Sequence, residues 1–297
     1  MKKSYCTCDV FTTTRFGGNQ LAVVLDGQGL SAAQMQAIAR EFNYSETTFV
    51  LPPKNPAHTA QVRIFTPSAE MPFAGHPTVG TAFALATLGI IGSDVTDIVF
   101  EENLGPVPVK IERSGGRVTR CTLTAPKNPY TVDFDLSHAG AAQLLGIAAP
   151  QLHTALPMAA LSTGSELLIM PLQDRAALQA CRLNTAAWDA ASPATQHQQF
   201  YPCAIDPARS TAYVRMFAPA HGVLEDPATG SAAATFAGYL AQHIDTQDGE
   251  HAWTLIQGVE MGRPSELLLN YTRAGGLATN VRVSGAAVMV MQGELEI

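Results

Sequence analysis

Two segments of the chain carry no charge and consist of small and apolar residues throughout. The first runs from Thr78 to Leu88 and the second from Ala228 to Leu240. A helix without a polar face cannot lie against solvent, so other elements must enclose it. The pattern therefore predicts two central helices, each buried inside a shell of other structure.

Runs rich in alternating apolar and β-branched residues predict strands around both helices. In the first half these are residues 4–12, 21–25, 44–51, 98–101, 107–113 and 117–125, and in the second half residues 166–171, 200–205, 211–217, 253–258, 265–271, 280–284 and 287–292. Ser31 followed by Gln34 has the spacing of a capping box and predicts a helix that ends near Phe42. Residues 139–145 are predicted to be helical, and the Ala-rich residues 178–199 to form a surface helix and loop.

The second half of the chain repeats part of the first half. Val62–Pro67 reads Val-Arg-Ile-Phe-Thr-Pro, and Val214–Pro219 reads Val-Arg-Met-Phe-Ala-Pro. At nearly the same offset, His76–Ala82 corresponds to Asp226–Ala232, where the two predicted helices begin. Long-period similarity also occurs in solenoids, but two copies of about half the chain each fit a duplicated domain better.

Length and composition agree with two globular domains. A chain of 297 residues with 46% apolar and 14% charged residues can bury two substantial cores. We place the domains at residues 1–127 and 128–297, with the last strand able to cross back to the first domain. The net charge of −7 and the lack of a basic run argue against nucleic acid or an anionic membrane as a partner.

The chain shows the features of a cytoplasmic protein. No apolar run is long enough to span a bilayer, and the N-terminus lacks the apolar core of a signal peptide. Five cysteines, an odd number, favour reduced thiols. Cys6 and Cys8 share a face of a predicted strand but have no further ligands at metal-site spacing, so we interpret them as structural.

The candidate chemistry gathers where the two buried helices begin. Asp226 is a good N-cap and is followed by a proline that suits the first helical position. Unpaired backbone N–H groups at a helix start attract a carboxylate or phosphate. If the two copies face each other, His76 and Asp226 lie on opposite rims of one cleft. The residues predicted to contact the anion there are Gly75, Gly230 and Ser231.

Glu46 is the candidate base, because it opens a strand that otherwise carries few charges. An acid/base group beside a bound anion suits proton transfer at carbon. Each candidate also has a plain structural interpretation. Glu46 could be a solvated charge, His76 a donor to a loop carbonyl, and Asp226 only an N-cap. The residues alone leave these alternatives open.

Several stretches resemble the PhzF family, the phenazine-biosynthesis-like isomerases of the diaminopimelate-epimerase fold. They follow the family's order along nearly the whole chain: Asp9–Phe11, Gly18–Asn19, Ser45–Thr47, Phe73–Gly80, Glu225–Ala232, Gln257–Ser265 and Ser284–Val288. The resemblance implies an α+β fold of two pseudo-symmetric domains, each a curled, mostly antiparallel sheet around a buried central helix. It also implies an isomerase that uses no cofactor or metal, acts on a small-molecule carboxylate and forms a homodimer.

By motif, Glu46 stands at the position of the family's proton-shuttling glutamate, and His76 and Asp226 stand at its further acid/base positions. The phenazine-pathway member isomerises trans-2,3-dihydro-3-hydroxyanthranilate by moving a proton between ring carbons. Related racemases of the fold carry a cysteine at each helix opening, and neither opening holds one here. This disfavours a two-thiol mechanism. Two alternatives remain: a non-catalytic relative that binds a small carboxylate, and an epimerase or racemase of the same fold.

Overall fold

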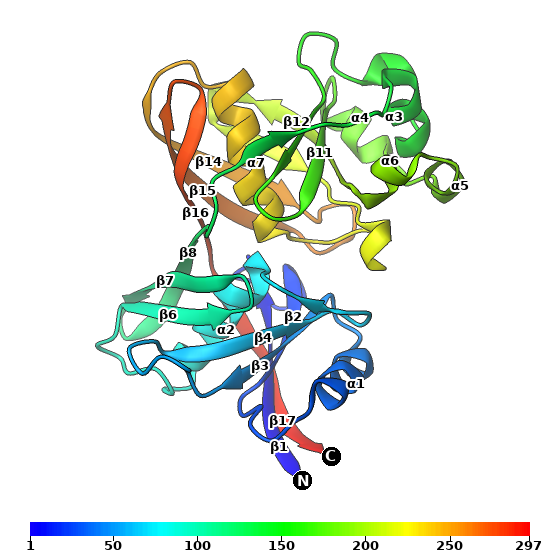
Figure 1. The fold of residues 1–297 in the computed structure, drawn as a ribbon. Helices are drawn as coiled ribbons and strands as arrows, with labels where there is room; N and C mark the ends of the chain where they lie inside the picture. Colours follow the sequence, from blue (N-terminus) through cyan, green and yellow to red (C-terminus); the bar gives the residue numbers. More distant parts are fainter. The chain divides into compact units, whose positions relative to one another are not determined.

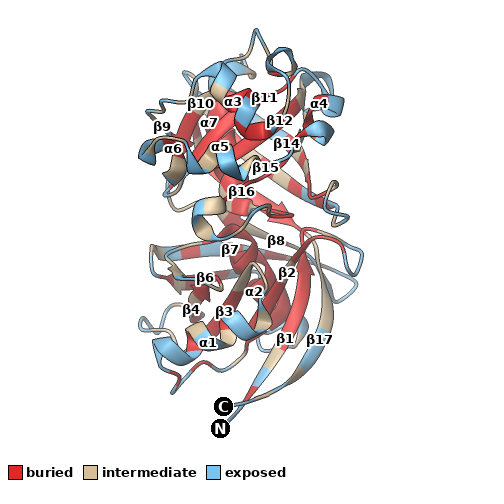
Figure 2. Ribbon diagram, turned by 90° about the vertical axis from the view of Figure 1, so that its right-hand side faces the viewer, coloured by how far each residue is buried: buried red, intermediate tan, exposed pale blue.

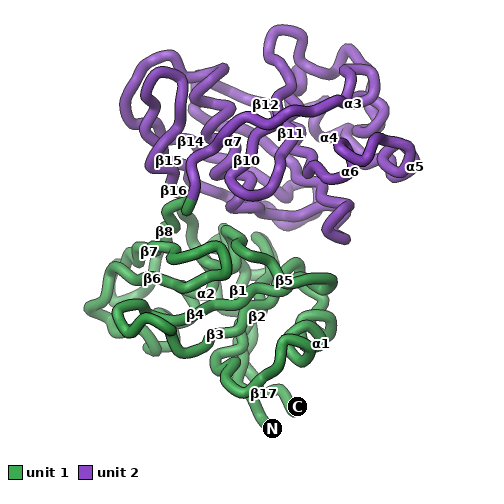
Figure 3. The backbone as a smooth tube through the Cα atoms, viewed as in Figure 1, with its two compact units in different colours: residues 1–126, 282–297 green, residues 127–281 purple.

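The computed structural model describes all residues from 1 to 297, and they form two compact units. Unit 1 comprises residues 1–126 and 282–297, and unit 2 comprises residues 127–281 (Figure 3). Each unit combines one long buried helix with a sheet of mostly antiparallel strands (Figure 1). The structure contains no helix that is both long and apolar enough to cross a membrane.

The sheet of unit 1 is curled, and the C-terminal segment of the chain pairs with both of its outer strands. Its strands are β1 (Lys2–Val10), β2 (Asn19–Val24), β3 (Glu46–Leu51), β4 (Ala60–Phe65), β5 (Glu70–Met71), β6 (Asp97–Glu102), β7 (Gly105–Ser114), β8 (Arg117–Thr124) and β17 (Ala287–Glu296). They pair in the order β1, β2, β3, β4, β6, β7, β8, with parallel pairing at β2–β3 and β4–β6. The last residues of β16 (Leu277–Gly285) pair with β8, and β17 pairs with β1. The two termini therefore lie side by side in unit 1 (Figure 1).

Helix α2 (Gly75–Thr87) lies inside this curled sheet, and every residue from Gly75 to Leu85 is buried (Figure 2). The predicted burial of the first helix is confirmed. The helix begins before Thr78, where the sequence placed its start. Pro77 fits the first helical turn, where a missing N–H costs no hydrogen bond, so the helix extends back to Gly75.

Gly80 allows α2 to approach the first two strands closely. A Cβ atom at this position would lie 2.5 Å from Leu21 Cδ2 and 2.6 Å from Val10 Cγ2. Both neighbours are fully buried, so neither can move into open space. The absence of a side chain at Gly80 therefore sets the depth at which α2 sits in unit 1.

We expect Gly80→Ala to destabilise the protein. Overpacking costs about 1–3 kcal/mol, which exceeds the roughly 1 kcal/mol that alanine gains over glycine in a helix. Thermal unfolding would measure the difference. Gly140→Ala is the matched control, because Gly140 is half-buried and its nearest neighbour is the end of the Leu136 side chain. A Gly80→Ala protein that melts at or above the wild-type temperature would contradict this account of the packing.

Unit 2 has its own sheet. Its strands are β9 (Tyr130–Val132), β10 (Ala159–Ser162), β11 (Glu166–Pro171), β12 (Gln199–Asp206), β13 (Thr211–Val214), β14 (Gly249–Gln257), β15 (Ser265–Ala274) and most of β16. The first seven pair in numerical order, with parallel pairing at β11–β12 and β13–β14. Helix α7 (Gly230–His243) packs on β10, β11 and β15 and is buried from Ala232 to Ala241 (Figure 2). The predicted burial of the second helix is also confirmed.

The start of α7 differs from the prediction, because Asp226 is not its N-cap. The helix begins at Gly230, and Thr229 is the N-cap residue, without a side-chain capping bond. The Gln257 side chain instead forms hydrogen bonds with both Asp226 and Thr229 and so holds the loop that precedes α7. A tertiary contact that the local sequence does not show therefore replaces the expected cap.

The smaller helices follow the prediction to different degrees. Helix α1 (Ala32–Phe42) has the predicted capping box between Ser31 and Gln34, and α3 (His138–Leu145) matches the expected helical segment. The Ala-rich region forms three short helices where one was expected. These are α4 (Arg175–Ala180), α5 (Thr185–Asp189) and α6 (Pro193–His197), and three 3₁₀ turns lie at Ala149–Gln151, Pro207–Arg209 and Pro219–His221. Asp174, Asn184 and Ser192 cap the three short helices, which explains the repeated interruption.

Candidate active site

Glu46 is the first residue of β3, which begins two residues later than the predicted strand 44–51. Alternate residues of a strand share one face, and Thr48, two residues on, contacts α2 through a 2.9 Å hydrogen bond between its hydroxyl and that of Thr81. Glu46 therefore lies on the face of β3 that is turned to α2. Its side chain is 16% exposed, so it is sheltered but still open to solvent.

His76 lies in the first turn of α2 and is 3% exposed. Its Nε2 atom is 3.5 Å from Glu46 Oε2, and its Nδ1 atom is 3.2 Å from Nδ2 of Asn19. Nε2 has no hydrogen-bond partner, so it is the ring nitrogen left to interact with Glu46. A contact slightly longer than an ordinary hydrogen bond is common in ligand-free sites and shortens when substrate binds.

Burial keeps His76 uncharged. Desolvation lowers the pKa of His76 from 6.5 to about 3, although a hydrogen bond to the Gln20 backbone opposes the shift. The imidazole is therefore neutral at physiological pH, and its contact with Glu46 is not an ion pair. A neutral imidazole next to a carboxylate can orient it, and once Glu46 has taken up a proton the imidazole can accept that proton at Nε2.

In unit 2, Asp226 lies in the loop before α7 and is 7% exposed. Its carboxylate accepts a hydrogen bond from the Thr229 hydroxyl. Gln257, at the end of β14, is fully buried and ties this loop together. Its Nε2 atom donates to Asp226 O at 2.7 Å and to Thr229 Oγ1 at 3.0 Å, and its Oε1 atom accepts the Thr229 N–H at 3.2 Å. The position of Asp226 is thus fixed by hydrogen bonds on both its side chain and its backbone.

A buried ion pair anchors the same loop from its other side. Arg215 donates from Nε and Nη2 to Glu225, each at 2.8 Å, in a bidentate geometry. Its Nη1 atom donates to the carbonyl oxygens of Leu178 and Cys181. Glu225 directly precedes Asp226, so this pair limits how far the loop can move.

Neither long helix has a side-chain cap at its N-terminus. Ala74 and Thr229 occupy the two N-cap positions, and neither makes a side-chain capping bond. The predicted binding residue Gly75 is the first residue of α2, and Gly230 and Ser231 are the first two of α7. Their backbone N–H groups are therefore the ones that a helix leaves for an external acceptor.

The structure thus groups the predicted residues into two sets, one in each unit. Glu46, His76 and Gly75 lie together in unit 1, while Asp226, Gly230 and Ser231 lie together in unit 2. Two residues that contact them, Asn19 and Gln257, belong to the motifs Gly18–Asn19 and Gln257–Ser265 but were not predicted as site residues. Asn19 begins β2 shortly before the apolar residues 21–24, and Gln257 ends β14 directly after Leu255 and Ile256; a polar residue beside such apolar residues is the signal that could have identified them.

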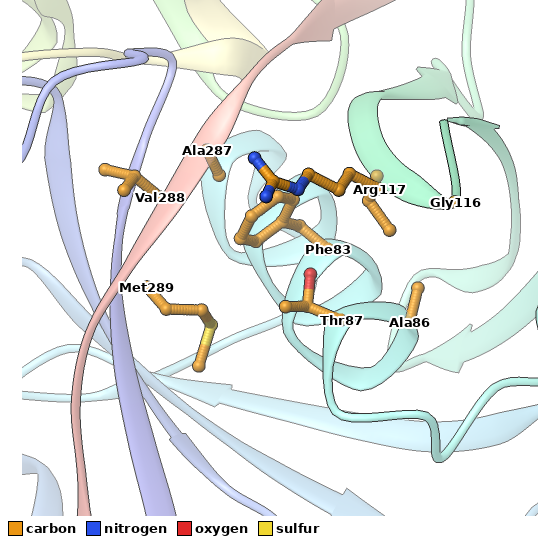
Figure 4. A pocket seen from close by; sticks show the side chains of 9 residues that line it. Phe83, Ala86, Thr87, Gly116, Arg117, Ala287, Val288 and Met289 are labelled. Atoms are coloured by element: carbon orange, nitrogen blue, oxygen red, sulfur yellow. The ribbon is translucent and has the colours of Figure 1, made fainter. Parts of the chain in front are cut away.

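A cavity of about 350 Å³ lies elsewhere in unit 1, beside the C-terminal half of α2 (Figure 4). Its walls come from α2, from the start of β8 and from β17, beyond the residues at which β8 pairs with β16. Neither Glu46 nor His76 lines it. We therefore do not place the candidate site in this cavity.

Comparison with known proteins identifies the family. The family model described as phenazine biosynthesis-like protein, PhzC-PhzF, matches residues 8–293. The chain belongs to the PhzF family. Its relatives include an uncharacterized isomerase of Mesorhizobium japonicum, 43% identical over 99% of both chains. They also include the trans-2,3-dihydro-3-hydroxyanthranilate isomerase of Pseudomonas chlororaphis, 37% identical over 98% of both chains. The relatives identify the chain as an isomerase.

Solved structures agree with the fold of a PhzF protein. A PhzF-family phenazine biosynthesis protein of Bacillus anthracis superposes over the full length of both chains with a TM-score of 0.89 at 26% identity. A hydroxyproline epimerase of Agrobacterium vitis superposes with a TM-score of 0.64 at 13% identity. The second likeness concerns the fold alone. Together they place this PhzF-family chain in the epimerase-like α+β fold.

The cysteines of this PhzF-family chain lie away from both helix openings and are all buried and unpaired. Burial raises the pKa of Cys6, Cys121 and Cys181 to about 12, and it also raises the pKa of Cys8 and Cys203 well above the ordinary value of a thiol. Because the thiolate is the reactive form, none of them is ready to act as a base or nucleophile at neutral pH. No group of three or more His, Cys, Asp or Glu side chains is arranged to hold a metal ion.

Thiol-blocking reagents should therefore leave activity largely intact. We expect the native protein to lose little turnover after incubation with iodoacetamide, while the same protein unfolded in guanidinium becomes alkylated. Mass spectrometry of both samples checks the extent of modification. Rapid inactivation that substrate prevents would instead indicate a thiol in the site.

Proposed function

We propose that this protein isomerises trans-2,3-dihydro-3-hydroxyanthranilate, or a closely similar small cyclic amino or hydroxy acid, by moving a proton from one carbon to another. The observation that carries the proposal is the contact between Glu46 and His76 at the uncapped N-terminus of α2. It combines a proton-transfer pair with donors for a carboxylate. The relative from Pseudomonas chlororaphis that bears this activity by name is similar over almost the full length.

Glu46 serves as the base in this proposal. Its carboxylate takes the proton from one carbon and returns it to another, so no atom is gained or lost and no external oxidant or reductant is needed. His76 orients Glu46 and accepts a proton from protonated Glu46 at Nε2, which leaves an imidazolium beside the carboxylate. Asp226 acts as the second acid/base group, at the carbon or oxygen where charge develops.

The substrate carboxylate binds at the helix starts in this proposal. The N–H groups of Gly75, Gly230 and Ser231 supply the donors, and the positive ends of the helix dipoles favour the negative charge. A bound carboxylate or sulfate at these N–H groups, observed in a crystal structure, is the expected result.

Pseudo-symmetry of the two units belongs to the same proposal. From β1 to β7 the pairing alternates antiparallel and parallel as it does from β10 to β15. Arg63 pairs with Glu70 and lies over the Phe65 ring at 5.1 Å, as Arg215 pairs with Glu225 and lies over Phe217 at 5.0 Å. Both arginines lie in the repeated Val-Arg-x-Phe sequence. These likenesses support an origin by duplication.

Two other functions predict different behaviour. A non-catalytic relative would bind small carboxylates without exchanging their carbon-bound hydrogen, and it would have no need for the neutral His76 beside Glu46. An epimerase or racemase would return the proton to the same carbon and invert its configuration. The buried, protonated cysteines make a two-thiol version of that reaction unfavourable.

By resemblance to the family, we also propose that the enzyme is cytoplasmic and forms a homodimer. Light scattering at micromolar concentration measures the molar mass. A mass of twice 31.4 kDa is expected, and a single monomer mass would reject the dimer.

The decisive experiment is a screen of small carboxylic acids in deuterium oxide, beginning with trans-2,3-dihydro-3-hydroxyanthranilate. Proton NMR follows both the loss of carbon-bound hydrogen and the appearance of an isomer. We expect an isomer with its hydrogen on a different carbon. Binding without exchange across the whole screen would favour the binding relative, and inversion without a shift would favour the epimerase.

A further inference from the structure

Glu102 is a second buried carboxyl group at the start of α2, and the proposed chemistry does not use it. It is the last residue of β6 and is 5% exposed. Its Oε1 atom lies 2.5 Å from the Thr78 hydroxyl, and its Oε2 atom is buried without a protein hydrogen-bond partner. Thr78 belongs to the first turns of α2, two residues after His76.

The hydrogen atoms in this cluster can be counted. The Thr78 hydroxyl has one hydrogen, and its oxygen lies 2.7 Å from the carbonyl oxygen of Ala74 and 2.5 Å from Glu102 Oε1. A carbonyl oxygen can only accept, so the Thr78 hydrogen belongs to the Ala74 contact. The contact with Glu102 then needs a hydrogen from the carboxyl group. The geometry therefore fits a carboxylic acid that donates to Thr78, which in turn donates to Ala74.

We propose that Glu102 is a positioning residue for His76, and that it works as a neutral carboxylic acid that fastens the first turn of α2 through Thr78 and Ala74. These two residues bracket Gly75 and His76, so the chain of hydrogen bonds fixes the backbone that carries the imidazole. A neutral acid also adds no negative charge near Glu46 or near the donors proposed for the substrate carboxylate. The effect on turnover rests on the proposed function, while the protonation of Glu102 does not.

The surroundings of Glu102 support its neutral form. Burial raises the pKa of Glu102 to about 8, although Thr78 and the Ala74 backbone oppose the shift. His76 is the only titratable residue of α2, and β7 places Gly105 opposite Glu102. Glu101 accepts hydrogen bonds from the backbone of Lys54 and Asn55 and the ring of His58. Glu70 pairs with Arg63 and accepts a hydrogen bond from Asn103, the residue after Glu102. No cation pairs with Glu102.

The protonation state can be tested without any substrate by comparing the wild type with Glu102→Gln. Between the ordinary pKa of 4.5 and about 8, folded Glu102 keeps a proton that unfolded Glu102 has lost. The wild type should therefore lose stability relative to Glu102→Gln as the pH rises through this range, and the gap should level off above it. A melting-temperature difference that stays constant from pH 5 to pH 9 would overturn the neutral-acid assignment.

The positioning role can be tested with Glu102→Gln, Glu102→Ala and Thr78→Val. The glutamine amide can still donate to Thr78, so Glu102→Gln should keep kcat within about threefold of wild type. A misplacement of about 1 Å can cost roughly 100-fold, so Glu102→Ala and Thr78→Val should lower kcat about 10- to 100-fold. Glu112→Gln is the matched control, because Glu112 is a half-buried carboxylate on β7 whose ion-pair partner is Arg120. Nitrogen NMR of the His76 ring should change in Glu102→Ala and Thr78→Val but not in Glu102→Gln.

The outcomes separate this inference from the proposed function. If the wild type fails to turn over the substrate, the proposed function fails, while the unfolding and NMR experiments still decide the role of Glu102. If Glu102→Gln loses as much turnover as Glu102→Ala, an ionised carboxylate is required and the inference is wrong. Unchanged His76 resonances in Thr78→Val would equally reject the positioning role. Thr78→Val also serves as the second variant if Glu102→Ala does not fold.

Discussion

Replacing Glu46 with glutamine is expected to lower turnover by roughly 10²- to 10⁴-fold, the range that general acid–base catalysis contributes. Glutamine keeps the size of the side chain and can form a hydrogen bond with His76, but it cannot accept a proton from carbon. The fold should survive because Glu46 is at the edge of β3 and partly exposed. Carboxylate affinity should survive because the proposed donors belong to the helix starts.

The comparison needs kcat, ligand affinity and melting temperature for wild type, Glu46→Gln and Glu41→Gln. Glu41 is an exposed residue of α1 in the same unit, so its substitution controls for the loss of one negative charge. Near-normal turnover in Glu46→Gln would refute the proposed mechanism. If turnover, affinity and melting temperature fell together, Glu46 would be structural and the binding-protein alternative would gain.

Asp226→Asn is expected to have the second large effect, a loss of roughly 10²-fold or more in turnover, because the amide cannot exchange a proton. The melting temperature should change little. Asp226 does not cap α7, and an asparagine oxygen can still accept the Thr229 hydroxyl hydrogen. The Gln257 bonds also involve the backbone at 226, which the substitution leaves in place.

Asp189→Asn, at an exposed site at the end of α5, is the control for this second experiment. A large fall in melting temperature together with normal kcat in the folded fraction would show that Asp226 is a structural residue. An N-cap at Asp226, as the sequence predicted, would imply a loss of stability in Asp226→Asn. The observed start of α7 at Gly230 removes the basis for that expectation.

The large features of the fold could be predicted because they depend on composition over many residues. The absence of charge across Thr78–Leu88 and Ala228–Leu240 requires burial whatever the details of packing. The capping box at Ser31 depends only on residues three positions apart and was also predicted correctly. In the candidate site, equally local patterns predict that Glu46 lies near the start of a strand and that His76 lies near the start of a helix.

What the sequence could not show depends on contacts between distant segments. His76 lies close to Glu46 because α2 packs against β3. Asn19, whose side chain contacts the His76 ring, belongs to a third element, β2. The start of α7 was predicted incorrectly because Gln257, far along the chain, holds the loop that a local cap would otherwise hold. Glu102 was absent from the predicted site for the same reason. It ends an ordinary strand, and only the fold brings it to α2.

Cleavage of the substrate carbon–hydrogen bond tests the central claim most directly. Wild type and Glu46→Gln are each mixed with trans-2,3-dihydro-3-hydroxyanthranilate in deuterium oxide, with the enzyme in excess over the substrate. In this single turnover, NMR follows the hydrogen on the original carbon and the hydrogen on the new carbon. The account predicts that wild type removes the original hydrogen and forms the isomer. Glu46→Gln should slow the removal itself by roughly 10²- to 10⁴-fold. Removal of that hydrogen by Glu46→Gln at the wild-type rate would contradict the account.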